Sequence, residues 1–154
     1  VPFIRGAHFC LEDGEVRINH PAYDIGIEEG SIERSQALWK GPIEPRGISR
    51  VACQAIVNAQ KERRLRWVVV APDCVLGNSV NFLQLPDVVL DSLAVEHGSV
   101  DEGLLFVAAQ LNSEALNLWS RAWAANNNVN NYELESLPLP PPSTEGALNY
   151  ALRQ

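Results

Sequence analysis

The side chains that could carry out catalysis in this 154-residue chain are few and widely spaced. His8, Cys10 and His20 lack the tight spacing of metal ligands, so we interpret them as partly buried polar residues. Cys53 falls on the apolar face of a predicted strand, which indicates a buried structural thiol and not a nucleophile. The sequence has no glycine-rich phosphate-binding loop. We therefore expect no catalytic centre, no metal site and no cofactor site in this chain.

A second group of residues has the chemistry of nucleic-acid binding. The formal net charge of −7 at first argues against phosphate contact. Residues 1–45, however, hold four basic and eight acidic residues, and residues 67–154 hold two basic and ten acidic residues, so these parts carry −4 and −8. The segment between them has one acidic and six basic residues, a charge of +5. The six basic residues of this basic segment are Arg46, Arg50, Lys61, Arg63, Arg64 and Arg66.

Within the basic segment, Arg50, Gln54 and Asn58 recur every four residues on one face of a predicted strand. Arg binds the O6 and N7 atoms of guanine, and Asn or Gln binds N6 and N7 of adenine, each through two hydrogen bonds. These residues therefore form a candidate base-reading ladder. Three cations at the hairpin tip would hold it on phosphates: Lys61, Arg63 and Arg64. The alternative is a hairpin whose polar face simply contacts water.

Hydrophobic periodicity predicts the strands that would position these side chains. Strict alternation over residues 50–57 predicts a half-buried strand. Residues 65–71 are rich in β-branched side chains and predict a second strand, with the polar residues 58–64 as the hairpin loop between them. Further short strands are predicted at 74–76 and 79–85.

Two consecutive helices are predicted after these strands. Ser99 and Glu102 have the spacing of a capping box, which marks a helix start. Asn112-Ser113 interrupts the helical pattern and predicts a junction between two helices. One apolar stripe would run through both helices: Leu104, Ala108, Leu111, Ala115, Leu118 and Ala122. Trp119 and Trp123 are expected in the core.

The order of strands first and helices last predicts an α+β fold. We expect a small mixed or antiparallel sheet with a basic hairpin, followed by a helical pair and a short terminal helix. Three further segments are predicted: a helix over 31–41, an extended stretch over 132–140 and the terminal helix over 143–152. The length fits a single domain spanning residues 1–154.

The composition limits the cellular locations that fit this sequence. Three cysteines at wide spacings do not form a disulfide framework and favour a reducing, cytoplasmic location. No apolar run is long enough for a membrane span, so no membrane partner is expected. The chain contains no methionine and begins at Val1, from which we expect a processed product or a fragment of a larger protein.

Several stretches resemble one known family. These are IRGAHF (4–9), RVACQAIVN (50–58), RRLRWVVVAP (63–72), VLGNSVNFL (75–83), LLFVAAQLNSEALNLWSRA (104–122) and NNNVNNYELESLPLP (126–140). In this order they resemble the target-recognition domain of adenine-specific (N6) DNA methyltransferases from type II restriction–modification systems. The similar group is the one with a TaqI-like C-terminal specificity domain. The resemblance covers roughly residues 3–142.

The resemblance implies a division of labour. In that family a separate catalytic domain binds S-adenosylmethionine and methylates a flipped adenine. Its Asn/Asp-Pro-Pro-aromatic motif and its glycine motif are absent here. The chain would then dock double-stranded DNA without catalysing methylation itself, and its partner domain would lie in the same protein or in a separate subunit. A restriction endonuclease can accompany such a methyltransferase.

The matched positions imply which residues face DNA. By this resemblance they are Arg5, Arg50, Gln54, Asn58, Arg63, Arg64, Arg66, Asn78 and Ser79. Leu111-Asn112-Ser113 and residues 137–140 are expected to be structural, and the asparagine run 126–131 is either a DNA-facing loop or a plain polar loop. The DNA hypothesis predicts binding that weakens steeply with salt. The alternative is a protein-interaction domain, or a separate specificity subunit, with no catalysis of its own.

Overall fold

The computed structural model describes residues 1–19, 47–124 and 126–138, and these confirm the predicted α+β fold. In the central sheet, β4 (Arg50–Gln54) pairs antiparallel with β5 (Trp67–Val70) on one side and with β7 (Val80–Phe82) on the other. Two smaller pairs lie beside this sheet: the parallel pair β1 (Phe3–Ile4) and β6 (Val75–Leu76), and the hairpin of β2 (Phe9–Glu12) and β3 (Glu15–Ile18). A single 3₁₀ turn, η1 (Gly6–His8), joins β1 to β2.

The β2–β3 hairpin turns through Asp13-Gly14. Both residues are in the left-handed region, with φ of 51° and 82°. Positive φ at both central residues is the type I′ geometry, which matches the twist of the two strands it joins. The sequence Asp-Gly therefore determines the register of this hairpin.

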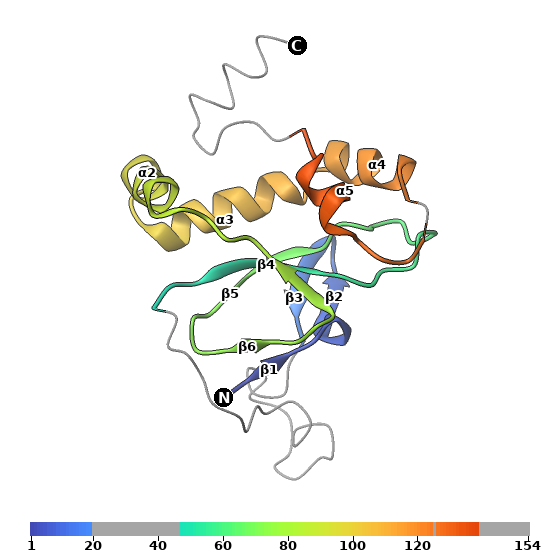
Figure 1. The fold of residues 1–154 in the computed structure, drawn as a ribbon, viewed down its shortest axis with the longest axis horizontal. Coiled ribbons are helices and arrows are strands. Elements are labelled where there is room, and N and C mark those ends of the chain that lie inside the picture. The colour runs from blue at the N-terminus through green and yellow to red at the C-terminus, as the bar shows by residue number, and fades with distance from the viewer. Residues whose placement is uncertain (20–46, 125, 139–154) are drawn as a thin grey trace.

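The central strand β4 is buried on both faces, which the sequence did not predict. Its Val51 and Cys53 belong to a main core with Trp67 and the helices, whereas Ala52 belongs to a second core with Ile4 and other residues from β1, β2 and β5–β7. Figure 1 shows the helices on one side of the sheet and β1, β2, β3 and β6 on the other. A strand is confirmed at Arg50–Gln54 within the predicted range 50–57, but the expectation that only one of its faces is buried is wrong, because Arg50 and Ala52 on the second face are also covered.

Four helices follow the sheet in the described part of the chain. They are α2 (Asp87–His97), α3 (Val100–Leu111), α4 (Glu114–Ala122) and α5 (Asn131–Glu135). The start of α3 is confirmed, since the Ser99 hydroxyl accepts a hydrogen bond from the Glu102 N–H at 3.2 Å. The junction at Asn112-Ser113 is also confirmed, and Ser113 caps α4.

The Asn112 side chain connects this junction to the sheet. It accepts a hydrogen bond from the Trp67 N–H at 2.9 Å and donates one to the Trp67 carbonyl at 2.7 Å. Gly98, with φ of 95°, ends α2, and Gly103 lets α3 pack closely on Leu93 of α2. The structural role expected for Leu111-Asn112-Ser113 is thus confirmed.

Three helical predictions are wrong. Helix α2 was not predicted at all, and α5 lies where an extended stretch over 132–140 was expected. The apolar stripe fails in α4, where Leu116, Asn117 and Ser120 are buried and the stripe residues Ala115, Leu118 and Ala122 are exposed. The reason is the break at Asn112-Ser113, which resets the phase of the second helix. As a result Trp119 packs on the main core, but Trp123 is 65% exposed and not a core residue.

Some predictions fall outside the described residues: the helix over 31–41, the terminal helix over 143–152, and the positions of His20, Arg46, Leu139 and Pro140. Leu137 is buried in the main core, as expected. No helix within the described ranges combines the length and the apolar character that crossing a membrane requires.

Candidate nucleic-acid interface

Arg64, expected at an exposed hairpin tip, is completely buried. Its guanidinium donates to the Asn126 carbonyl at 3.0 Å, to the Asn128 carbonyl at 2.7 Å and to Oε2 of the buried Glu133 at 2.9 Å. A longer bond of 3.4 Å reaches the Val57 carbonyl. The prediction that Arg64 contacts phosphate is therefore wrong. This side chain instead ties the loop after β4 to the loop and helix near the end of the described chain.

Arg50, expected as a base reader, is also buried, with 7% of its surface exposed. One guanidinium nitrogen donates to the Cys74 carbonyl at 2.7 Å, and the group lies 5.6 Å from the centre of the Phe82 ring. Its position on β4 explains this, because the second core covers the face from which Arg50 projects. Arg50 is therefore not available to bind a base.

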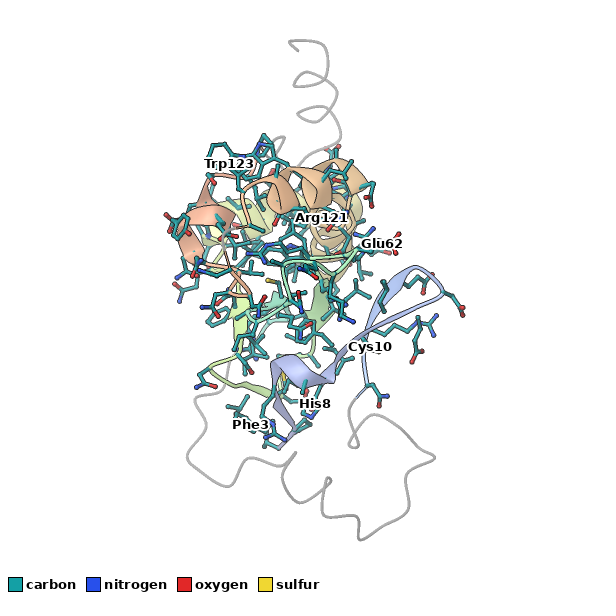
Figure 2. All side chains as sticks on the ribbon, turned by 90° about the vertical axis from the view of Figure 1, so that its right-hand side faces the viewer. Phe3, His8, Cys10, Glu62, Arg121 and Trp123 are labelled. Atoms are coloured by element: carbon teal, nitrogen blue, oxygen red, sulfur yellow. The ribbon has the colours of Figure 1, made fainter. Side chains whose placement is uncertain are left out.

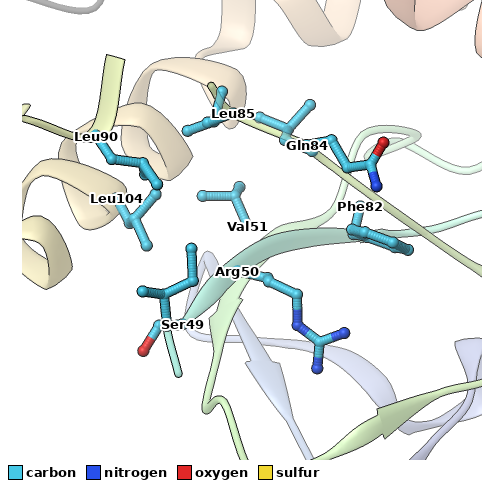
Figure 3. Close-up of a pocket in the computed structure, with 10 residues that line it drawn as sticks. Ser49, Arg50, Val51, Phe82, Gln84, Leu85, Leu90 and Leu104 are labelled. Carbon is cyan, nitrogen blue, oxygen red and sulfur yellow. The ribbon is translucent and has the colours of Figure 1, made fainter. Parts of the chain in front are cut away.

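A mainly apolar pocket of about 310 Å³ lies beside Arg50. Figure 3 shows Val51, Leu90 and Leu104 on one side of it and Phe82 with Arg50 on the other. The pocket lining contains no carboxylate, histidine or cysteine. The described lining does include the Ser49 hydroxyl, but no general base beside it that would activate this hydroxyl as a nucleophile.

The other cations of the basic segment differ in their availability. Arg63 donates to the Asn112 carbonyl at 2.7 Å and pairs with Glu114 at 3.1 Å, so it also holds the loop to the helices. Arg66 is half-buried and lies 3.4 Å from Oε1 of Gln54. Lys61 is exposed. Lys61 is therefore the exposed cation among the described ones of this segment, whereas Arg66 also donates from Nε to the Arg63 carbonyl at 3.3 Å and would contact a ligand only by giving up these long bonds.

The amide side chains of the same region are better placed. Beyond the end of β4 the exposed Ile56 forms an isolated antiparallel bridge with Asn128. Gln54 ends β4, and beyond it Ile56 and Asn58 are exposed while Val57 between them is buried. Asn128 joins them from the facing loop. We call this surface the amide face: Gln54, Asn58 and Asn128, with Ile56 between them.

Hydrogen bonds fix the backbone of the amide face. The Val57 N–H donates to the Asn127 carbonyl and the Val129 N–H donates to the Ala55 carbonyl, both at 2.8 Å. The Asn127 side chain accepts from the Ala59 N–H at 3.0 Å, and that of Asn126 accepts from the Asn128 N–H at 2.8 Å. Figure 2 looks onto this side of the molecule, with Trp123 near the top and His8 near the bottom. The loop 126–130 is therefore held against the chain after β4 by hydrogen bonds.

The remaining predicted contacts lie near the first strands. The Ser79 hydroxyl accepts from the Gly6 N–H at 2.8 Å, and a Cβ at Gly6 would lie 2.7 Å from the Ser79 carbonyl oxygen, so Ser79 acts as a packing residue. Asn78 is exposed beside it. Arg5 is half-buried, and its Nε has no hydrogen-bond acceptor among the described residues. The Ala55 N–H donates to the Ser79 carbonyl at 2.9 Å, so the chain at Asn78 passes close to the amide face.

Cys53 matches its prediction as a buried thiol. Burial raises its pKa from 9.0 to about 12, with the nearby Arg64 lowering it slightly. The protonated thiol is a poor nucleophile. Within residues 1–19, 47–124 and 126–138, no group of three or more metal-ligating side chains comes together.

Sequence reasoning missed Ile56 as part of this surface and left Asn128, within the asparagine run 126–131, open between a DNA-facing and a plain polar loop. The alternation over 50–58 did place Ile56 on the polar side of the strand, which is the signal that could have identified it. The pairing with Asn128 joins positions far apart in the chain, so no local pattern predicts it. Comparison with family models, curated proteins and solved structures finds no match to this chain.

Proposed function

We propose that this chain is a DNA target-recognition module that reads a short double-stranded sequence for an adenine-N6 methyltransferase of a restriction–modification system. The observation that carries the proposal is the amide face: three amide side chains displayed together on a hydrogen-bonded backbone. Amide groups bind the N6 and N7 atoms of adenine, and the adjacent Arg66 is suited to guanine. The family resemblance of the sequence supports the same function.

In this proposal the partner domain supplies the chemistry. It would bind S-adenosylmethionine and hold the flipped adenine, while the present chain would select the site and fix the orientation of the duplex. Because a methyltransferase acts on genomic DNA, the proposed location is cytoplasmic.

The test uses the full chain and a pool of duplexes with a randomised centre. The proposal predicts enrichment of a defined sequence, and Gln54→Ala relaxes the preference at one position of that sequence. Gln84→Ala is the matched control, because Gln84 is an exposed amide outside the amide face. Since non-specific DNA binding lies near 10⁻⁴–10⁻⁶ M, chemical-shift titration to about 1 mM duplex detects even weak binding. No binding at that concentration refutes the proposal.

The structure also changes the expected salt dependence. With all six cations of the basic segment on phosphates, log K would fall with log salt at a slope of about −5. With Lys61 and Arg66 alone the expected slope is about −2. Substituting Arg46, which lies outside the described residues, by Ser measures its separate share. Lys61→Ala should weaken binding to all sequences alike, whereas Gln54→Ala should not.

A second candidate function is protein interaction, which one observation favours. Leu118 and Trp123 are exposed on and just after α4, and exposed aromatic side chains are enriched at protein interfaces. Leu118→Asp with Trp123→Ser would abolish partner binding under this alternative. Under the DNA proposal the same double variant keeps its sequence preference in the duplex selection.

A further inference from the structure

We infer that Ile56 is an apolar wedge that enters the base stack of the bound duplex between the two bases read by Gln54 and Asn58. The inference rests on the proposed function and adds a deformation of the DNA to it. Proteins that bind the minor groove frequently insert an apolar side chain such as Ile, Leu, Phe, Met or Pro between base steps. The wedge proposed here would enter from the groove that the amides read. Ile56 meets that description in three respects.

The first respect is exposure in a polar setting. Ile56 is 55% exposed, so more than half of its surface is free to contact a ligand. Its neighbours on the same side of the chain are the amides of Gln54 and Asn58, each two residues away. A protein-docking patch requires contiguous apolar area, and this surface has one apolar side chain among amides. Its composition is therefore that of a base-edge contact with one stacking element.

The second respect is rigidity. Ile56 and Asn128 form a non-hydrogen-bonded antiparallel pair. The hydrogen bonds are made by the residues on either side of them, from the Val57 N–H to the Asn127 carbonyl and from the Val129 N–H to the Ala55 carbonyl. In such a pair the facing side chains are closest, so Asn128 supports Ile56 on one side. Ala55 is in turn held to the Ser79 carbonyl at 2.9 Å. A β-branched side chain also has restricted χ1 freedom, which lowers the entropy lost on insertion.

The third respect is the anchorage of the facing strand. The buried Arg64 donates to the carbonyl of Asn128, the bridge partner of Ile56, and to that of Asn126, two residues before it. The residues around Ile56 are therefore braced from inside the protein. Insertion of a side chain between stacked bases requires a rigid backbone behind that side chain. Other exposed β-branched residues, such as Val88 and Val95 on the acidic helix α2, lack these amide neighbours and this bracing.

The experiment uses the full chain and the duplex that it selects from the randomised pool. The adenine analogue 2-aminopurine brightens when it unstacks. Because it lacks the N6 amino group, it replaces one at a time the adenines of this duplex that Gln54 and Asn58 do not read. We expect a several-fold increase in fluorescence at one step on binding of the wild-type chain. Ile56→Ala should abolish the increase and weaken binding about ten-fold, because the lost contact is one buried apolar side chain. Val88→Ala is the matched control and should behave as wild type.

Two further variants separate a wedge from a mere contact. Ile56→Phe keeps a large apolar side chain and should retain the fluorescence increase, whereas Ile56→Thr keeps the β-branched shape but should lose most of it. All these changes are at an exposed position, so melting temperatures should match the wild type. Normal binding by Ile56→Ala with an unchanged fluorescence increase, or no increase for the wild type at any position, overturns the wedge and leaves the proposed function standing. Failure of the wild-type chain to bind duplex DNA overturns both.

Discussion

Replacing Arg64 by Met should destabilise the protein more than any substitution on the exposed part of the basic segment. Arg64 has no exposed surface and Glu133 has 4%, and their ion pair measures 2.9 Å. Methionine fills a similar length without charge, so the Glu133 carboxylate would be left buried without its cation. Breaking one side of a buried ion pair costs about 3–5 kcal/mol. This is a large share of a typical stability of about 5–15 kcal/mol.

The three carbonyls that Arg64 also satisfies add less to this figure. Asn126 and Asn128 are exposed residues, so their carbonyls can take up water once the guanidinium is gone. Most of the expected loss of stability therefore arises from the buried Glu133 carboxylate that is left without a cation. It follows that Arg64→Met combined with Glu133→Leu should recover much of the stability, because neither charge is then left alone.

The assay is urea unfolding followed by tryptophan fluorescence, since Trp67 lies in the main core. The wild type, the two single variants and the double variant form a double-mutant cycle. We expect a coupling energy of roughly 1.5 kcal/mol or more between the two positions. A cost of Arg64→Met under about 1 kcal/mol, the range of exposed ion pairs, would refute the reasoning. So would a double variant whose loss equals the sum of the single losses.

Three further changes test other parts of the structure. Asn112→Ala removes both side-chain hydrogen bonds to the Trp67 backbone. It should lower the free energy of unfolding, measured in urea, by about 2–3 kcal/mol. A free energy of unfolding equal to that of the wild type would show that water replaces these bonds. Gly103→Ala would place a Cβ 2.5 Å from the Leu93 Cβ, so a cost of about 1–3 kcal/mol should appear as a lower melting temperature, and an unchanged one contradicts the close α2–α3 packing. Because burial raises the Cys53 pKa from 9.0 to about 12, its contribution to stability is complete below pH 9 and is lost as the pH rises through that interval. Cys53→Ala should flatten this alkaline decline, and an equal decline in both proteins would assign it to other groups.

Local patterns predicted the parts of the fold that local chemistry determines. The Ser99 cap, the helix junction at Asn112-Ser113 and the buried thiol of Cys53 all follow from residues within a few positions of each other. Helix α2 was missed because its N-cap is Pro86, whose side chain offers no capping hydrogen bond, and because its apolar residues do not form a clear stripe. Exposed Val88 is one such residue.

The state of the arginines could not be predicted from local sequence. Arg64 finds its acceptors at Asn126 and Glu133, which are 62 and 69 positions away. Within the sequence itself, RRLR looks alike whether its side chains face phosphate or carbonyl oxygens. The alternation on which the base-reading ladder rested could separate two faces of a strand. It could not show that a second core covers the Arg50 end of one face and leaves the Gln54 and Asn58 end open.

These contacts change what the charge distribution along the sequence implies about DNA binding. Three of the six cations of the basic segment act as internal cross-links: Arg50 to the Cys74 carbonyl, Arg63 to Glu114 and Arg64 to Glu133. Arg50 and Arg64 are buried and the charge of Arg63 is paired with Glu114, so the segment presents less positive charge than its sequence indicates, and the chain as a whole carries −7. A module built in this way has amides with which to discriminate bases but little charge with which to attract a duplex. If it reads DNA as proposed, most of the phosphate contacts come from the catalytic partner, and specificity and affinity are divided between the two domains.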